Sequence, residues 1–438
     1  MDILYCELEN NMQLELFSPK TIKEKSNRLA NKLQSSDRPF HDWYRFVLSF
    51  PAHLVREYID KFGLHQCDTI LDPFCGTGTT LVEAKLQGLN SIGIEANPMA
   101  HFASRIKIDW TINPDELLEH ASRVAEAANK AISSHSELRT LPPEAYNLLL
   151  KNSISPLPLH KAMILIDKIK LLKDEKLYEH ELLAFAKAIV FHASNLHFGP
   201  EVGVSRAKKS DALVVEYWIS EIKTMAKDLR LEKPEENSIA YHADARQFQN
   251  LLEPNSISAV FTSPPYPNEK DYTRTTRLES VLLGFINNKE ELRHLKKGLL
   301  RSNTRNVYKG DNDDIWISEH KEIQRIADTI ENRRIELGKT SGFEKLYSKV
   351  TKLYFGGMAR HLAELRPFLK KDAYLGYVVG DQASYLRVII RTGTLLSDIA
   401  QSLGYELESI DLFRTRFATA TKKQMREEIV VLRWPGKK

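Results

Sequence analysis

Short apolar runs alternate along this chain with longer stretches in which apolar residues recur every three to four positions. The short runs are partly β-branched and end at polar or glycine-containing turns, which is typical of buried strands, whereas the longer spacing predicts helices. Six short runs predict strands, at residues 69–71, 91–94, 239–244, 255–261, 374–379 and 428–432. Because strands and helices alternate in these parts, the sequence predicts an α/β fold with a doubly wound sheet.

A glycine-containing turn follows the first predicted strand. Residues 72–80 read Asp-Pro-Phe-Cys-Gly-Thr-Gly-Thr-Thr, and a helical pattern over 81–86 begins directly after them. Gly76 and Gly78 allow a left-handed backbone and a close approach of the chain to a ligand. The free N–H groups at the start of the next helix can also bind a ligand. The turn therefore predicts a nucleotide-type cofactor site.

Acidic residues end the next two predicted strands. Glu95 follows residues 91–94 at close to the separation at which an acid binds ribose hydroxyls. Asp244 ends the run 239–244, where it can accept a hydrogen bond from an adenine amino group. The turn lacks the third glycine of the dinucleotide fingerprint, and no Gly-Lys-Ser/Thr pattern marks a phosphate loop. Both differences count against an NAD-dependent oxidoreductase.

A second turn, residues 263–266, follows the apolar run that ends at Phe261 and reads Ser-Pro-Pro-Tyr. An exocyclic base amine is a poor nucleophile, and a site activates it by accepting hydrogen bonds from its N–H groups. The Ser263 hydroxyl and the Pro264 carbonyl are suitable acceptors, and the proline pair stiffens the turn. Tyr266 can stack on a base that has been turned out of a duplex.

The two turns together resemble the motifs of S-adenosylmethionine-dependent methyltransferases that act on amino groups of DNA bases. The resemblance implies a mostly parallel seven-stranded sheet with large helical insertions, S-adenosylmethionine as cofactor and double-stranded DNA as substrate. It implies catalytic roles for Ser263, Pro264, Pro265 and Tyr266, and cofactor contacts for Phe50, Asp72, Pro73, Phe74, Gly76, Gly78, Thr79, Glu95 and Asp244. A leading serine in the catalytic turn favours N4 of cytosine, with N6 of adenine as the alternative. A restriction–modification system, with a cognate restriction endonuclease as partner, is also implied.

Two helical stretches without clear strand signals interrupt the α/β parts. We divide the chain into an N-terminal arm (1–40), the first part of the core (41–110), a helical insertion and candidate target-recognition region (111–237), the core with the catalytic turn (238–286), a basic helical insertion (287–351) and the end of the core (352–438). Residues 199–204, followed by a basic group at 206–209, are expected to form a loop that meets DNA.

Basic residues gather in three places, although the net charge is only +4. The segments 293–309 and 414–426 contain no acidic residue, and a smaller group lies at 206–209. A solvated surface is the usual role of such groups, but beside a base-modifying site they favour phosphate contacts. The candidates for DNA contact are Arg274, Lys296, Lys297, Arg301 and Arg305.

Four positions each allow two roles. Phe50 either packs against the methionine end of the cofactor, as the resemblance implies, or belongs to the core. Asp271 either reaches the base or its neighbouring nucleotides or caps a helix. Leu282 or Leu283 either lines the adenine pocket or belongs to the core, and Asp381 stands beside the target base or caps a turn.

The composition, with 42% apolar and 27% charged residues among 438, is that of a globular protein. No apolar run approaches the roughly 18 residues of a membrane span, and the N-terminus lacks a signal-peptide pattern. Cys6, Cys67 and Cys75 have no metal-ligand spacing. We therefore expect a reduced, cytoplasmic protein without a metal site, in which Cys75 packs rather than reacts.

Two further classes remain open. An RNA base methyltransferase would use the same catalytic turn, although no separate RNA-binding module is recognisable. A non-catalytic regulator that binds S-adenosylmethionine or DNA would be expected to have a damaged catalytic turn, and the turn here is intact.

Overall fold

A computed structural model describes residues 34–45, 49–135, 137–199, 201–232, 234, 236–268, 270–418 and 422–436. Most of the arm predicted at 1–40 therefore lies outside the described residues. Its described end contains a short helix, η1 (Ser35–Asp37), followed by Phe40, which is fully buried. Residues 34–40 thus pack as part of the folded protein.

Seven strands form one sheet in the order β5-β2-β1-β6-β7-β9-β8. The strands are β1 (Thr69–Asp72), β2 (Asn90–Glu95), β5 (Ser238–His242), β6 (Ile257–Thr262), β7 (Leu369–Gly380), β8 (Glu406–Ala418) and β9 (Lys423–Trp434). Only β9 runs antiparallel to its neighbours in this sheet, and the other adjacent pairs are parallel. The predicted mostly parallel seven-stranded fold is confirmed. The six apolar runs identified in the sequence are all strands, and β8 is the strand that they do not include.

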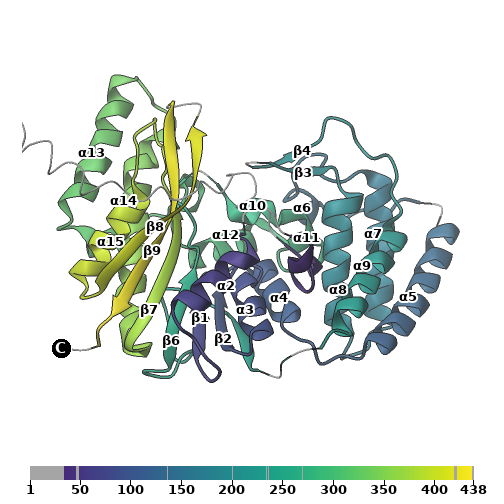
Figure 1. The fold of residues 1–438 in the computed structure, drawn as a ribbon. Helices are drawn as coiled ribbons and strands as arrows, with labels where there is room; N and C mark the ends of the chain where they lie inside the picture. The colour runs from purple at the N-terminus through teal and green to yellow at the C-terminus, as the bar shows by residue number, and fades with distance from the viewer. Residues whose placement is uncertain are drawn as a thin grey trace, which may run out of the picture.

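Helices cover both faces of the sheet (Figure 1). One face packs against α13 (Lys321–Glu336), α14 (Tyr347–Leu365) and α15 (Thr392–Ser402), through a buried cluster that joins side chains of β6, β7 and β9 to these helices. The other face packs against α2 (Ala52–Lys61), and α3 (Thr79–Leu86) and α4 (Pro98–Lys107) lie beside it. The result is the three-layer arrangement expected of a doubly wound fold.

A helical lobe stands beside this core (Figure 1). It is built from α5 (Pro114–Ser134), α6 (Pro143–Tyr146), α7 (Pro156–Leu171), α8 (Tyr178–Lys187), the π-helix η3 (Ala188–Ala193) and α9 (Val214–Leu229). Its apolar side chains form one cluster with α3 and α4, at the centre of which Trp218 is fully buried. None of the described helices has the length and the apolar character that crossing a bilayer requires.

The prediction of a plain loop at 199–204 is wrong. Strands β3 (Leu196–Phe198) and β4 (Val202–Val204) form an antiparallel hairpin there, with His197 opposite Gly203. A Cβ atom on Gly203 would lie 2.5 Å from His197 Nε2, so a larger residue there would require the His197 side chain to move aside. Gly203, which suggested a loop, instead lies in a strand.

The later helices connect β6 to β7. They are α10 (Tyr272–Thr275), α11 (Arg277–Leu282), α12 (Lys289–Gly298), η4 (Thr304–Asn306), η5 (Asp313–Ile317) and then α13, η6 (Glu344–Leu346) and α14. Leu282 packs in the cluster of the helical lobe, which supports its core role. The η5 segment lies directly on α14, because Gly356 leaves room for the Asp313 backbone.

Candidate active site

The turn after β1 has the geometry that its two glycines predict. Gly76 and Gly78 both have positive φ, +51° and +81°, and Gly78 precedes the first residue of α3. A Cβ atom on Gly78 would lie 3.0 Å from Ser104 Cβ, so the turn packs closely against α4. Lys107, at the end of α4, is fully buried and donates from its Nζ to the Thr77 carbonyl at 2.7 Å, which fixes the turn to this helix.

Asp72 fixes the start of this turn from inside the protein. Its Oδ1 accepts hydrogen bonds from the Thr262 hydroxyl at 2.6 Å and from the Phe74 N–H at 3.2 Å. Burial raises the pKa of Asp72 to about 6. Asp72 therefore joins the cofactor turn to Thr262, the residue directly before the catalytic turn.

Glu95 ends β2 and faces the same turn. Its carboxylate accepts from the Gly76 N–H at 2.9 Å and from the Asn97 N–H at 2.7 Å. Burial raises the pKa of Glu95 to about 7, against the opposing effect of these two N–H donors. Asn97, which the sequence reading did not select, caps α4 through its side chain and donates to Thr276 Oγ1 at 3.2 Å.

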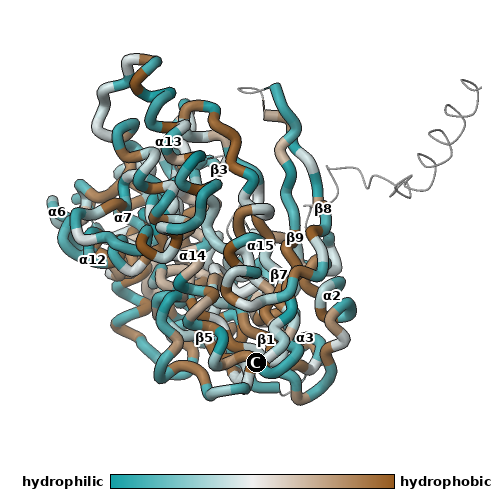
Figure 2. Tube along the Cα trace, turned by 90° about the vertical axis from the view of Figure 1, so that its left-hand side faces the viewer, coloured by the Kyte–Doolittle hydropathy of each residue, from teal (hydrophilic) through white to brown (hydrophobic). Residues whose placement is uncertain are grey.

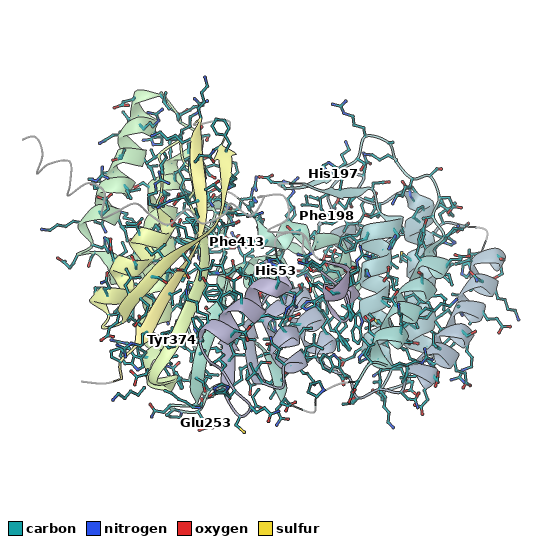
Figure 3. The ribbon with its side chains drawn as sticks, viewed as in Figure 1. His53, His197, Phe198, Glu253, Tyr374 and Phe413 are labelled. Carbon is teal, nitrogen blue, oxygen red and sulfur yellow. The ribbon has the colours of Figure 1, made fainter. Side chains whose placement is uncertain are left out.

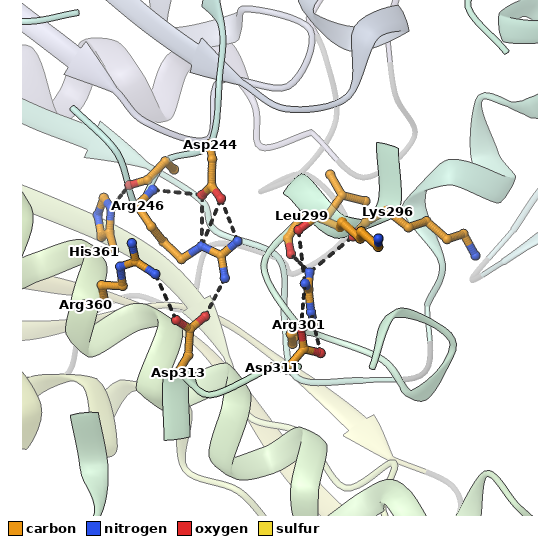
Figure 4. Close-up of polar contacts among 11 residues, drawn as sticks. Asp244, Arg246, Lys296, Leu299, Arg301, Asp311, Asp313, Arg360 and His361 are labelled. Carbon is orange, nitrogen blue, oxygen red and sulfur yellow. Dashed lines mark hydrogen bonds and ion pairs between the residues drawn. The ribbon is translucent and has the colours of Figure 1, made fainter. Parts of the chain in front are cut away.

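Asp244 follows β5 and is held by a chain of ion pairs (Figure 4). The Arg246 guanidinium donates to both oxygens of Asp244, with Nη2 to Oδ2 at 2.6 Å, and also to Asp313. Asp313 in turn pairs with Arg360 of α14 at 3.3 Å. The orientation of Asp244 is thus fixed by Arg246, and through it by the insertion that contains Asp313.

The catalytic turn follows β6 without interruption. The Ser263 hydroxyl donates to the Val378 carbonyl at 3.1 Å, which leaves its lone pairs free to accept. The Tyr266 hydroxyl donates to Glu427 at 3.3 Å, and Glu427 also pairs with Arg414.

Gly380 allows Tyr266 its position. A Cβ atom on Gly380 would lie 3.0 Å from Tyr266 Cε2, so a larger residue there would have to displace the ring or the strand. Tyr266 is therefore held from two strands, by Gly380 of β7 through contact and by Glu427 of β9 through its hydroxyl.

One cavity of about 440 Å³ joins the two turns. Eleven of the thirteen predicted catalytic and cofactor residues line it: Phe50, Pro73, Phe74, Gly76, Thr79, Glu95, Asp244, Ser263, Pro264, Pro265 and Tyr266. Asp72 and Gly78 do not line it and instead shape the turn. Lining residues that the sequence reading did not select include Leu300, Gln382, Phe413 and Arg416. Phe413 lies on β8 above α2, the helix that contains His53 (Figure 3).

The five candidates for DNA contact differ in how exposed they are and in whether they are already paired. Lys296 pairs with Asp271 at 2.6 Å, and Arg301 is only 5% exposed because Asp311 and the carbonyls at the end of α12 surround it (Figure 4). Arg274 is half-buried. Lys297 and Arg305 are exposed and remain available to a partner.

Two alternatives that the sequence left open can now be described. Asp271 caps α10 by accepting from the Thr273 N–H at 3.1 Å, in addition to its pair with Lys296. Asp381 is fully buried and binds Arg391 and Arg426, so it holds two arginines rather than capping a turn.

Cysteine and metal chemistry find no support in the described part of the chain. Cys75 is buried between Gly93 and Ser104, and burial raises the pKa of its thiol well above the usual value. No group of three or more His, Cys, Asp or Glu side chains among the described residues is arranged to hold a metal ion.

Comparisons with known proteins agree with this geometry. Residues 15–104 match the model of a family described as DNA methylase, the N6/N4 methyltransferases. The chain is 27% identical to the type II methyltransferase M.BsoBI of Geobacillus stearothermophilus, over 96% of this chain and 88% of the relative. It is 24% identical to the type II methyltransferase M.AvaI of Anabaena variabilis, over 94% and 89%.

A shorter match is with a tRNA (guanine(10)-N2)-dimethyltransferase of Methanothermobacter thermautotrophicus, 37% identical over 15% of this chain and 18% of the relative. The matches support an amino-methyltransferase family for this chain. The two type II enzymes are similar to it along nearly its whole length, helical insertions included.

Proposed function

We propose that this protein is a DNA methyltransferase that transfers a methyl group from S-adenosylmethionine to the exocyclic amine of a base turned out of the duplex. The observation that carries the proposal is the single cavity lined by both Glu95 of the cofactor turn region and Ser263 of the catalytic turn. Its volume is in the range of small-molecule sites. The family match and the two type II relatives favour a DNA substrate within a restriction–modification system.

The donor set of the cavity fits S-adenosylmethionine. Glu95 is a half-buried carboxylate that lines the cavity beside a glycine turn, and it suits a ribose diol. Asp244 offers acceptor oxygens for an adenine amine, and Phe50, Ile94 and Leu300 provide apolar walls. When bound, S-adenosylmethionine supplies an electrophilic methyl group.

The residues of the catalytic turn prepare the amine. Ser263 Oγ donates its proton to the Val378 carbonyl, so it accepts from one amine N–H. The Pro264 carbonyl accepts from the other, and both contacts shift electron density to the amine nitrogen. Tyr266, held by Glu427, provides a face on which the base stacks. No enzyme nucleophile is needed, in agreement with the burial of Cys75, which raises the pKa of its thiol.

We propose N4 of cytosine as the target atom, on the serine that leads the catalytic turn, with N6 of adenine as the alternative. Serine and the acidic or amide residues that can replace it all accept from an amine, so the chemistry of Ser263 permits both bases. We further propose that residues 111–237 take part in target recognition.

The test is methyl transfer from labelled S-adenosylmethionine to duplex DNA, followed by mass spectrometry of the digested nucleosides. N4-methylcytosine is expected. N6-methyladenine would retain the mechanism and change the base. Ser263→Ala in parallel shows whether the transfer depends on the catalytic turn.

Transfer to RNA and not to DNA would support an RNA base methyltransferase. The short match with a tRNA amino-methyltransferase is the observation that keeps this second candidate open. It covers a small part of both chains, whereas the type II relatives cover most of both.

A further inference from the structure

Strands β8 and β9 continue beyond the sheet as a two-stranded ribbon. The pairing of β7 with β9 ends at Gly380 opposite Glu427, while β8 and β9 stay paired as far as Ala418 opposite Lys423. We call residues 415–418 and 422–425 the ribbon. Because β9 is antiparallel to β7, the ribbon extends from the edge at which β7 ends, where the catalytic cavity also lies. Figure 1 and Figure 2 show both strands rising past the other strands of the sheet.

One face of the ribbon is anchored to the cavity. Arg416 lines the cavity and donates to the Asp381 carbonyl at 3.2 Å, and Met425, paired opposite it, is buried. At the base of the ribbon Arg414 binds Glu427, which holds the Tyr266 hydroxyl. The position of the ribbon is therefore fixed relative to the catalytic aromatic ring.

The other face is exposed and apolar at its centre. Phe417 is 60% exposed and pairs across the ribbon with exposed Gln424. Side chains alternate between the faces of a strand, so Phe417 points away from the face that Arg416 and Met425 share. A large aromatic side chain left in water at the end of an edge strand is a surface that a partner can cover.

The basic residues of the ribbon indicate a negatively charged partner. No acidic residue occurs between residues 412 and 426. Arg416, Lys422 and Lys423 form no ion pair with any carboxylate among the described residues, and all three are exposed. Three exposed cations and an exposed aromatic ring on one ribbon are complementary to a polyanion that also offers flat apolar surface, which describes nucleic acid.

We propose that the ribbon docks in a groove of the target duplex beside the base that enters the cavity. Lys422 and Lys423 contact phosphates, and Phe417 packs against sugar and base edges. The major groove admits a two-stranded β-ribbon, and apolar side chains of groove-binding proteins can insert between base steps. The inference rests on the proposed function, since it places a duplex over the catalytic cavity.

The test compares the affinities of wild-type and variant proteins for an unmethylated duplex that contains the sequence the protein methylates. Affinity is measured by fluorescence anisotropy at several salt concentrations. The double variant Lys422→Ala, Lys423→Ala should lower the slope of log affinity against log salt by about two. Phe417→Ala should weaken binding about tenfold and leave the slope unchanged. Binding of S-adenosylmethionine should be unchanged in both, because Lys422, Lys423 and Phe417 do not line the cavity.

Matched controls are Lys371→Ala, an exposed lysine near the start of β7 at the opposite end of the sheet, and Leu407→Ala, an exposed leucine at the start of β8. Both should bind DNA like the wild type. Unchanged affinity and slope in both ribbon variants would overturn the inference, and so would equal losses in the controls. The binding measurement needs no turnover. A protein that binds duplex through the ribbon but transfers no methyl group would therefore refute the proposed function alone, whereas transfer with indifferent ribbon variants would refute this inference alone.

Discussion

The Thr262 hydroxyl donates a 2.6 Å hydrogen bond to Asp72 Oδ1, and this contact joins the two motifs of the chain. Thr262 ends β6 directly before the catalytic turn, and Asp72 ends β1 directly before the cofactor turn. The strands are parallel neighbours, so their carboxyl ends meet at one edge of the sheet. The parallel pairing brings together residues that are 190 positions apart in the sequence.

Thr262→Val should disturb this junction. The substitution keeps the shape of the side chain and removes the 2.6 Å hydrogen bond to the buried Asp72 carboxylate, which keeps its contacts with the Phe74 N–H and Thr80. The unfolding free energy should therefore fall by about 1–3 kcal/mol. Affinity for S-adenosylmethionine, measured by calorimetry, should fall as well. Thr351→Val is the control, since that buried hydroxyl bonds only a carbonyl of its own helix. A cofactor affinity equal to that of the wild type would mean that the junction does not shape the turn.

Tyr266 should act through its ring more than through its hydroxyl. Tyr266→Phe removes the 3.3 Å contact with Glu427 but keeps the stacking face, so methyl transfer should fall only a few-fold. Tyr266→Ala removes both, and Ser263→Ala removes an acceptor of the amine, which should each lower kcat by about 10²–10³. Cofactor binding should persist in all three variants. Equal rates for Tyr266→Phe and Tyr266→Ala would exclude stacking.

Glu95 predicts a pH dependence of cofactor affinity. Burial raises its pKa to about 7, and a ribose diol that donates to the carboxylate favours the ionised form. Below pH 7 Glu95 must lose a proton on binding, so affinity for S-adenosylmethionine should decrease as the pH falls through about 7. Above pH 7 the carboxylate is already ionised and affinity should level off.

Glu95→Gln should remove the decrease in cofactor affinity near pH 7 and leave any titration of the cofactor itself. Isothermal titration calorimetry from pH 5.5 to 8.5 in buffers of different ionisation enthalpy measures both the affinity and the proton release. A step of equal size in Glu95→Gln would assign the titration to another group.

The sequence was sufficient for the parts of the fold in which apolar runs and motifs coincide. Strands β1, β2 and β6 carry buried β-branched residues up to the functional turns, so the pattern and the chemistry pointed to the same places. In β5 the run that leads to Asp244 was sufficient, although its Ile239 is 48% exposed. β8 lacks such a run, because it is an edge strand in which Leu412 and Phe417 are exposed between charged residues.

The ion pairs of the site could not be predicted, because their partners are distant in the sequence. The basic run around Lys296 and Arg301 suggested an open surface, but its acidic partners Asp271 and Asp311 are brought to it only by the fold. Arg246 stands two positions after Asp244, yet only the structure shows that it extends the contact to Asp313. Local patterns report which residues are charged, and the tertiary fold decides which charges are already paired.

Two adjacent lysines of α12 should therefore differ. Lys296 is 12% exposed and paired with Asp271, so Lys296→Ala should cost about 3–5 kcal/mol of stability, because the buried carboxylate loses its ion-pair partner and keeps only its hydrogen bonds from Thr273. Lys297→Ala should leave the melting temperature unchanged and lower the salt slope of duplex binding by about one. Thermal denaturation and anisotropy on both variants measure the contrast. A salt slope that is lower for Lys296→Ala than for Lys297→Ala would reverse the assignment.

Gly357 of α14 should control one wall of the cofactor cavity. A Cβ atom there would lie 2.4 Å from Leu300 Cδ1, and Leu300 lines the cavity. Gly357→Ala should cost about 1–3 kcal/mol of stability and raise KM for S-adenosylmethionine more than it changes kcat, because it displaces the wall and not the catalytic turn. Gly310→Ala is the control, since a Cβ atom at Gly310 meets no atom within 4 Å. Leu300→Ala removes the clash but leaves a space of its own, so the two substitutions are compared in a double-mutant cycle. Gly357→Ala should cost less stability in the Leu300→Ala background than in the wild type. An equal cost in both backgrounds would mean that the contact between Gly357 and Leu300 does not set the cavity wall.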